Sequence, residues 1–161
     1  GLLYWRTDTH WNQKGAFLAF EHMLARLGYS VPKVNFKLEG VKKGGLIAIS
    51  GLDAFPLKSG DNWRYKVPNL TDPVREHHPN GPKPLCGWRG VVQNPMAHND
   101  ESVWVIGDSF TNQMRSFIEA SFTEVRYIGH WNDELSELPE LIENAETKPD
   151  LVMVVRVERS F

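Results

Sequence analysis

The residues best suited to chemistry lie around two positions far apart in the chain, Ser109 and His10. Ser109 follows the apolar run of residues 103–106 and a Gly-Asp pair. A strand that ends in such a turn places its serine at the carboxyl end of a sheet, where α/β proteins hold their reactive groups. Gly107 allows a sharp turn, and amides that open a following helix can face a developing oxyanion. A serine hydroxyl is a weak nucleophile by itself, so this site requires a base.

The candidate base is His10, which stands two residues after Asp8. In an extended segment, side chains at i and i+2 leave the same face, so the carboxylate would lie beside the imidazole. An aspartate in that position fixes the tautomer of the histidine and stabilises the imidazolium. Each motif also has a simpler interpretation, a surface Asx-turn for Asp8 and a helix N-cap for Ser109. The occurrence of both motifs at junctions between an extended segment and a helix favours a catalytic triad.

The two motifs together resemble a known family. The segment Trp-Arg-Thr-Asp-Thr-His-Trp-Asn-Gln-Lys-Gly-Ala at residues 5–16, followed by Gly-Asp-Ser-Phe at 107–110, is similar to the SGNH-hydrolase-like domain of AlgJ/AlgX-type polysaccharide O-acetyltransferases. In that family the Asp-x-His motif precedes the serine, as it does here. The resemblance implies that Ser109 is the nucleophile, His10 the general base and Asp8 the residue that orients it.

The resemblance also implies a substrate class and a setting. It implies transfer of an acetyl group to hydroxyls of an exported, alginate-like polysaccharide through an acetyl-serine, with no cofactor. The expected partners are the polysaccharide acceptor, an acetyl donor that is a small ester or a partner protein, and exopolysaccharide-assembly proteins. The implied location is periplasmic or membrane-associated. Because the chain opens almost directly on the Asp-x-His motif, we expect it to be truncated at its N-terminus.

Two further residues are weaker candidates for the oxyanion site. Gly129 and Asn132 follow the second strong strand pattern, and a turn after a strand explains them equally well. In the strand order, Gly129 matches the block of SGNH esterases that contributes only a glycine amide. The block that usually supplies an asparagine would fall near residues 155–159, where no asparagine stands. The Ser109 amide is therefore the expected donor, and the side-chain donor stays open.

The elements that must position these residues predict an α/β fold. Apolar residues recur at helical spacing through residues 12–27, with Asn12 as N-cap and Gly28 as the stop. We predict a strand at 46–50, long loops over 51–100, and then strand 103–107, helix 111–121, strand 124–128, helix 137–146 and strand 151–157. This alternation predicts a parallel sheet flanked by helices, with a loop-rich insertion, in one domain over 1–161. The resemblance implies that this sheet is SGNH/flavodoxin-like.

The region of predicted loops contains the candidates for substrate contact. Arg64, Trp88 and Arg89 could bind an acidic polysaccharide, because aromatic rings stack on sugars and guanidinium groups pair with carboxylates. Packing of the loops onto the domain is an equally good explanation for each of them. His77 and His78, with His98 and Asp100 beyond, fit no zinc spacing, so we interpret the two adjacent histidines as solvated and predict no metal. The single cysteine, Cys86, is expected to be a loop or core thiol.

Composition narrows the class of function but does not choose within it. A net charge of −2 argues against general nucleic-acid binding. No apolar run in these residues is long enough to span a membrane, and we expect any export signal to belong to the missing N-terminal part. Three functions fit the motifs: an O-acetyltransferase, a carbohydrate acetylesterase with the same triad, and a glycan-binding module whose triad is not catalytic.

Overall fold

The computed structural model describes residues 2–51, 60–68, 70, 74–77, 90–130 and 135–156. Its centre is a five-stranded sheet, in the order β3 (Val74–His77), β4 (Gly90–Gln93), β6 (Phe122–His130), β5 (Asn99–Gly107) and β7 (Leu151–Val155). Strand β5 pairs in parallel with β6 and β7, whereas β4 is antiparallel to both β6 and β3. The predicted parallel sheet is confirmed for these three strands, and the β3–β4 edge makes the sheet mixed.

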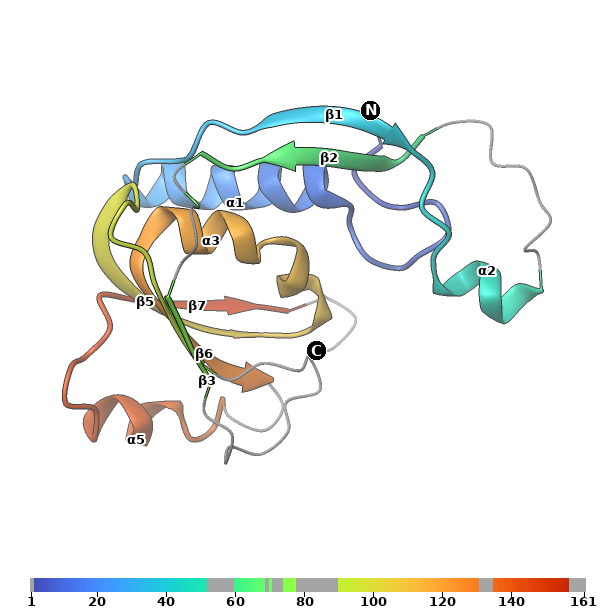
Figure 1. Cartoon of the computed structure of the whole chain (residues 1–161). Helices are drawn as coiled ribbons and strands as arrows, with labels where there is room; N and C mark the ends of the chain where they lie inside the picture. The colour runs from blue at the N-terminus through green and yellow to red at the C-terminus, as the bar shows by residue number, and fades with distance from the viewer. Residues whose placement is uncertain are drawn as a thin grey trace.

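The two helical crossovers lie on opposite sides of this sheet. Helix α3 (Arg115–Ser121) leads from β5 to β6, and α5 (Leu138–Glu143) leads from β6 across to β7. Right-handed crossovers that run in opposite directions along a sheet place their helices on opposite faces. Figure 1 shows this arrangement, with α3 above the strands and α5 below them. The carboxyl ends of β5 and β6 therefore border a topological switch point, where open α/β sheets bind their ligands.

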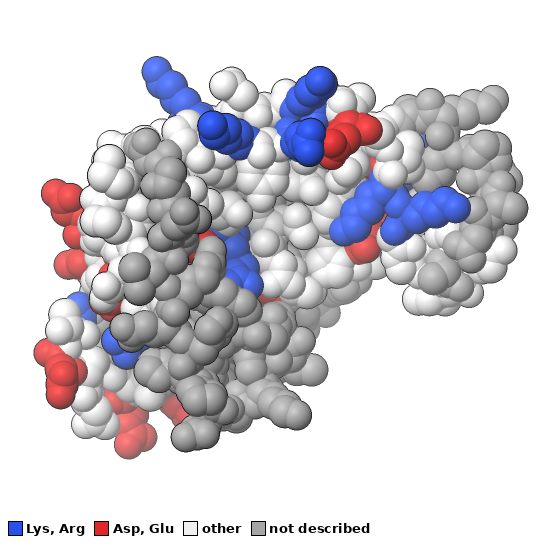
Figure 2. Space-filling view, in the orientation of Figure 1, with Lys and Arg blue, Asp and Glu red and all other residues white. Residues whose placement is uncertain are grey.

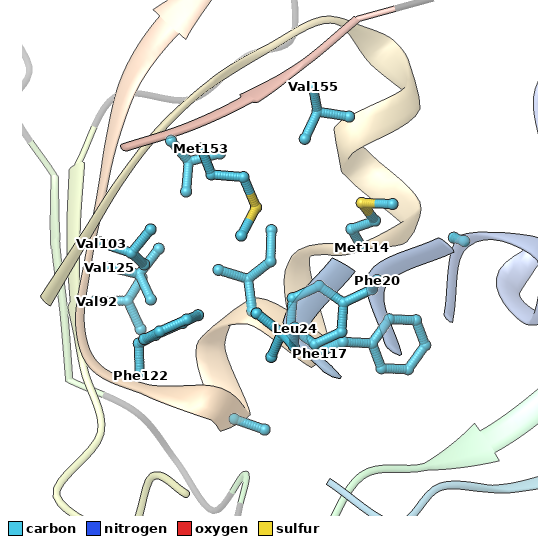
Figure 3. Packing of buried hydrophobic residues seen from close by; sticks show 14 of the residues in the cluster. Phe20, Leu24, Val92, Val103, Met114, Phe117, Phe122, Val125, Met153 and Val155 are labelled. Carbon is cyan, nitrogen blue, oxygen red and sulfur yellow. The ribbon is translucent and has the colours of Figure 1, made fainter. Parts of the chain in front are cut away.

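The hydrophobic core lies between the sheet and helices α1 and α3. Strand β5 is buried on both faces, as expected of a central parallel strand, with Val103 and Val105 on one side and Trp104 and Ile106 on the other. Figure 3 shows the main layer, in which valines of β4, β5 and β6 lie opposite aromatic and aliphatic side chains of the helices. The labelled members of this cluster are Phe20, Leu24, Val92, Val103, Met114, Phe117, Phe122, Val125, Met153 and Val155.

Helix α1 (Gln13–Leu27) agrees with the prediction at both ends. The side chain of Asn12 accepts a hydrogen bond from the Gly15 amide at 3.0 Å, which satisfies one of the free donors of the first turn. Gly28 ends the helix in the left-handed conformation, with φ of 81°. Phe20 and Leu24 are fully buried, whereas Leu27 in the last turn is 53% exposed.

The strand predicted at residues 46–50 is wrong, because the segment forms the short helix α2 (Gly45–Ser50). Two bonds set its start, from Leu46 N–H to the carbonyl of Thr7 at 3.0 Å and from Ile47 N–H to that of Gly44 at 3.2 Å. Gly51 then ends it with φ of 68°. A short apolar run shows no periodicity that separates a strand from a helix, and here a contact far away in sequence decides the outcome.

The prediction of continuous loops over 51–100 is also wrong where the structure describes this region. Strand β2 (Asn62–Lys66) pairs with β1 (Asn35–Gly40) as an antiparallel ribbon that lies along α1 (Figure 1). Aromatic rings join the ribbon to the core, since Tyr65 lies 5.0 Å from Phe117 and Phe36 lies 5.4 Å from Phe17 between ring centroids. The missed signal was the alternation of aromatic and polar residues in Asn62–Lys66.

The predicted helix at 111–121 is divided in two. A 3₁₀ helix, η1 (Ser109–Gln113), precedes α3, with Met114 between them. The other predicted elements of the second half are present with shifted ends.

Cys86 and His78 lie outside the described residues. Within the described ranges, no helix combines the length and apolar character needed to cross a bilayer.

Candidate active site

Asp8 and His10 lie on a loop whose two ends are held together. Tyr4 and Trp11 form an antiparallel bridge, and the Trp5 amide donates to the carbonyl of His10 at 3.3 Å. Between these contacts the chain bends, so the extended conformation predicted for this segment is wrong. The Asp8 carboxylate instead accepts the amide of His10 at 3.0 Å, in the manner of the Asx-turn that the sequence also allowed. This turn brings the carboxylate to the imidazole.

The three predicted triad side chains form one hydrogen-bonded chain. Nδ1 of His10 lies 2.5 Å from Oδ1 of Asp8, and Nε2 lies 2.6 Å from Oγ of Ser109. An ionised carboxylate can only accept, so the proton on the ring is assigned to Nδ1. Nε2 is then free to accept the Ser109 hydroxyl proton. This is the geometry that a general base needs toward a serine nucleophile.

The environment of Asp8 favours its ionised form. Burial raises the pKa of Asp8, but hydrogen bonds from the imidazole and amide of His10, the electrostatic attraction of that ring and a bond from the Gly45 amide together lower it below its usual 3.8. The carboxylate therefore remains negative beside His10 across the neutral range, as an orienting group must.

Ser109 is held by the end of β5 and the first turn of η1. The Asp108 side chain caps this turn by accepting the Phe110 amide at 2.8 Å, as the sequence suggested. Gly107 has no positive φ, so its predicted role in a sharp turn is wrong. Glycine is needed at this position because the Thr111 side chain lies close to its backbone, and a Cβ there would overlap the hydroxyl of Thr111.

The two halves of the site are joined by aromatic contacts. The rings of His10 and Phe110 lie 4.8 Å apart between centroids. The indole of Trp11 donates to the carbonyl of Phe110 at 2.8 Å, and its ring lies edge-on to the Phe110 ring at 5.3 Å. The residue that follows His10 is thus bound directly to the residue that follows Ser109, although 99 positions separate the two.

The sequence did not reveal the residues that support the Asp8 segment. Asp61 is completely buried, and its carboxylate accepts the amides of Arg6 at 2.8 Å and Lys42 at 3.1 Å. Thr7 donates its hydroxyl to the Lys42 carbonyl at 2.9 Å and accepts the Gly44 amide at 2.8 Å. Asp61 could not be recognised beforehand because its partners are backbone amides, which leave no trace in side-chain spacing.

Gly129 lies beside the nucleophile turn. A bulge in β6 places it opposite Ile106, and its φ of 140° is one that L residues rarely adopt. It lines a small cavity of about 30 Å³ together with Gly107, Asp108 and Asn112. Asn132, the other weak oxyanion candidate, lies outside the described residues.

The candidates for polysaccharide contact are not assembled around Ser109 in the described structure. Arg64 lies in β2 with its side chain 75% exposed, 3.5 Å from the carboxylate of Glu39 on the neighbouring strand. Trp88 and Arg89 lie outside the described residues. Within the part of the chain that the structure describes, no three His, Cys, Asp or Glu side chains gather as metal ligands.

A serine, a histidine and an aspartate aligned at the carboxyl end of a central parallel strand define a class, α/β proteins with a Ser-His-Asp site. The sequence matches no protein-family model and no curated protein. At the level of fold, however, the chain is similar to solved structures.

PatB1 of Bacillus cereus aligns with a TM-score of 0.60 at 15% identity, over 98% of this chain and 63% of its own. A DHHW family protein of Eubacterium siraeum aligns with a TM-score of 0.57 at 16% identity, over 97% of this chain and 59% of its own. The O-acetyltransferase domain of Pseudomonas putida AlgJ is also among the matches, with a TM-score of 0.46 at 17% identity, over 100% and 58% of the two chains. The alignments with PatB1 and the DHHW family protein confirm the predicted fold class. This chain spans about three-fifths of the length of the structures that it matches.

Proposed function

We propose that this protein is a serine-dependent O-acetyltransferase. The observation that carries the proposal is the position of His10, whose two ring nitrogens lie within hydrogen-bond distance of Asp8 and Ser109. Chance would rarely align three such groups at a switch point of the sheet. The motifs of residues 5–16 and 107–110 resemble those of polysaccharide O-acetyltransferases, and this resemblance supports acetyl as the group transferred.

The proposed reaction takes place in two steps on Ser109. Nε2 of His10 accepts the hydroxyl proton while Oγ forms a bond to the acetyl carbon of the donor. The tetrahedral intermediate then breaks its bond to the leaving group, which receives the proton from His10. An acceptor hydroxyl next gives its proton to Nε2, attacks the acetyl-serine and displaces Oγ, which recovers a proton.

The proposed acceptor is a hydroxyl of an exported polysaccharide, such as an alginate-like polymer. This part of the proposal rests on the resemblance of the motifs, and it carries with it an exported location and assembly proteins as partners. Arg64, Trp88, Arg89 and Asn132 remain candidates for contact with the acceptor or the oxyanion. Water in place of the sugar would make the same site an esterase, because the two reactions use the same three side chains.

The test is to follow acetylation of the protein with p-nitrophenyl acetate by intact-mass analysis. We expect a transient acetyl adduct on the wild-type chain and none on Ser109→Ala. Ser30→Ala is the matched control, because Ser30 is exposed at the opposite end of β5, where its amide is bonded to Asn99. Absence of an adduct on the wild-type chain, or an equal adduct on Ser109→Ala, would contradict the proposal.

Addition of candidate polysaccharides then separates transfer from hydrolysis. A transferase gives an acetylated polysaccharide and less free acetate as the acceptor concentration rises. An esterase releases acetate at a rate that no acceptor changes. Saturable polysaccharide binding by a chain that never becomes acetylated would instead favour the binding module.

A further inference from the structure

The oxyanion of the proposed reaction needs donors, and the amides around Ser109 are mostly engaged. Asp108 donates its amide to the carbonyl of Val155 at 3.1 Å, and Thr111 donates its amide to that of Asp108 at 3.0 Å. The Phe110 amide is held by the Asp108 side chain. For the Ser109 amide, the described part of the chain offers no partner. One backbone donor is thus free at the nucleophile, whereas oxyanion sites combine several.

A second donor is present on the same helical turn. Ser109 and Asn112 are three residues apart in η1, which is a 3₁₀ helix. Side chains at i and i+3 eclipse one another in this kind of helix, so that Asn112 lies above Ser109 on one face. In an α-helix the same spacing would rotate the two side chains apart by about 60°. Because the predicted helix is divided at Met114, its first part is a 3₁₀ helix, and this geometry places Asn112 on the same face as Ser109.

Asn112 has the exposure and the freedom that a ligand-binding amide requires. Its side chain is exposed, and it lines the small cavity beside Gly129 and Asp108. Within the described residues, its amide group makes no hydrogen bond. By contrast, the side-chain amide of Asn99 donates to the carbonyls of Ser30 and Ser121 at 3.0 and 2.7 Å. Asn99 is structural, whereas nothing in the described fold uses Asn112.

The neighbouring hydroxyl of Thr111 is a poorer candidate. Its oxygen is buried and has no hydrogen-bond partner among the described residues, but it lies against the backbone of Gly107, beneath the turn. Ser109 is partly exposed and Asn112 is exposed, whereas Thr111 is buried, so an acyl group on Oγ of Ser109 would extend on the side of the turn that presents Asn112. Thr111 fixes the turn, and Asn112 is the side chain able to reach the reacting atoms.

We propose that the side-chain amide of Asn112 donates a hydrogen bond to the oxyanion that forms when Ser109 is acylated, next to the Ser109 amide. This inference rests on the proposed function and assigns the side-chain donor that the sequence left open. The bond forms only as charge develops on the oxygen, so it lowers the barrier without tightening substrate binding. Loss of one such donor reduces kcat by about 100- to 1000-fold in known enzymes.

The experiment compares Asn112→Ala, Asn112→Asp and Asn112→Gln with Gln113→Ala, the neighbouring amide on the same helix. We expect Asn112→Ala to slow acylation of Ser109 by p-nitrophenyl acetate by about 100-fold or more, with little change in KM. Asn112→Asp is slower still, because a carboxylate repels the oxyanion. Asn112→Gln recovers part of the rate, whereas Gln113→Ala and the thermal unfolding midpoints of all variants stay at wild-type values.

The outcomes separate this inference from the proposed function. Wild-type rates in Asn112→Ala would overturn the inference alone, as would an equal loss in Gln113→Ala or a fall in thermal stability that accompanies the loss. A wild-type chain that neither p-nitrophenyl acetate nor a fluorophosphonate labels on Ser109 would overturn both. The fluorophosphonate is a second measure, because its phosphoryl oxygen occupies the oxyanion position, so its labelling rate falls in Asn112→Ala for the same reason.

Discussion

At the scale of single residues, the site depends on one aspartate that has two different bonds to one histidine. Oδ1 of Asp8 accepts both the amide and the ring N–H of His10. The first bond shapes the backbone turn and the second selects the tautomer. The Asx-turn and the triad were competing interpretations of the sequence, yet the structure contains the turn and the hydrogen-bond geometry of the triad at once.

Replacement of Asp8 by asparagine separates these two contributions. The asparagine oxygen can still accept the His10 amide, but the side chain no longer supplies the negative charge that stabilises the imidazolium, and its amide group selects the wrong tautomer when it turns toward Nδ1. We expect acylation of Ser109 to slow by roughly 10⁴-fold, the scale seen when a triad aspartate becomes asparagine. Stopped-flow release of p-nitrophenol measures the rate. A variant that retains wild-type acylation would show that Asp8 does not orient His10.

The same substitution has a consequence for stability. The pKa of Asp8 is lowered in the folded chain, so its ionised form stabilises the fold at pH values above the unfolded value of 3.8. This contribution is lost as the pH falls below 3.8, through the lower pKa of the folded state. In urea unfolding, the free energy of unfolding should therefore be larger for wild type than for Asp8→Asn at pH 7. This difference should vanish below pH 3.8. A difference that persists unchanged in acid would contradict this.

The three residues of the candidate triad, which lie within hydrogen-bond distance of one another, could be selected from the sequence because their types and flanking residues carry the signal. Their supports could not. Asp61 makes its bonds to backbone amides, and Asn112 matters through a 3₁₀ turn that apolar periodicity cannot distinguish from an α-helix. Gly107 was predicted to allow a sharp turn, but its φ is not positive. A glycine is needed there because a Cβ would overlap the hydroxyl of Thr111.

At the scale of elements, the second half of the chain could be predicted and the first half only in part. Strands β5 and β7 and helix α1 have long, consistent patterns that packing reinforces. Segment 45–50 is a helix whose start is held from far away in sequence, because the carbonyl of Thr7 accepts the amide of Leu46. The conformation of a short segment cannot be predicted from its local sequence pattern when residues distant in sequence determine it.

Asp61 connects three of these elements and should therefore be sensitive to a small change. It lies just before β2. Its carboxylate accepts the backbone amide of Arg6, which precedes the Asp8 turn, and that of Lys42, which precedes α2. Its backbone carbonyl accepts the side-chain amide of Asn12 at 3.1 Å. Asp61→Asn replaces one acceptor by a donor that faces an N–H, which leaves a buried donor unsatisfied. We expect a loss of about 1–3 kcal/mol in the free energy of unfolding, with slower acylation of Ser109.

The control for this variant is Asp100→Asn, which removes an exposed carboxylate from β5. Urea unfolding and acylation of both variants are measured side by side. Equal stability of the two variants would show that the Asp61 carboxylate does not hold the loop. Reduced stability with unchanged acylation would show that it supports the fold without positioning His10.

At the scale of the whole molecule, the net charge of −2 conceals a division of charge. Figure 2 shows basic side chains over the β1–β2 ribbon and acidic ones at the end of the molecule where α5 lies. The exposed cations of the ribbon include Lys37, Arg64 and Lys66, whereas α5 and its approach present Glu137 and Glu140. Net charge is therefore a poor guide to the sign of the ligand that this protein binds.

The stability of the molecule in alkali should depend on one buried ring. Tyr127 of β6 lies in the core beneath the cavity at the switch point, and its hydroxyl donates to the buried Glu119 of α3 at 3.2 Å. Burial, followed by the negative charge of Glu119, raises the pKa of Tyr127 well above 10. The folded chain consequently keeps this proton at pH values where the unfolded chain releases it.

Because the folded pKa is raised, the contribution of Tyr127 is complete below pH 10 and is lost as the pH rises above it. Tyr127→Phe removes the titrating group together with its hydrogen bond to Glu119, which contributes about 1.5–3 kcal/mol. At pH 7 the free energy of unfolding in urea should be larger for wild type than for Tyr127→Phe. This difference should become steadily smaller above pH 10. Absorbance of tyrosinate, compared between the two chains, assigns the titration. A gap that stays constant through strong alkali would mean that Tyr127 ionises as readily in the folded chain as in the unfolded one.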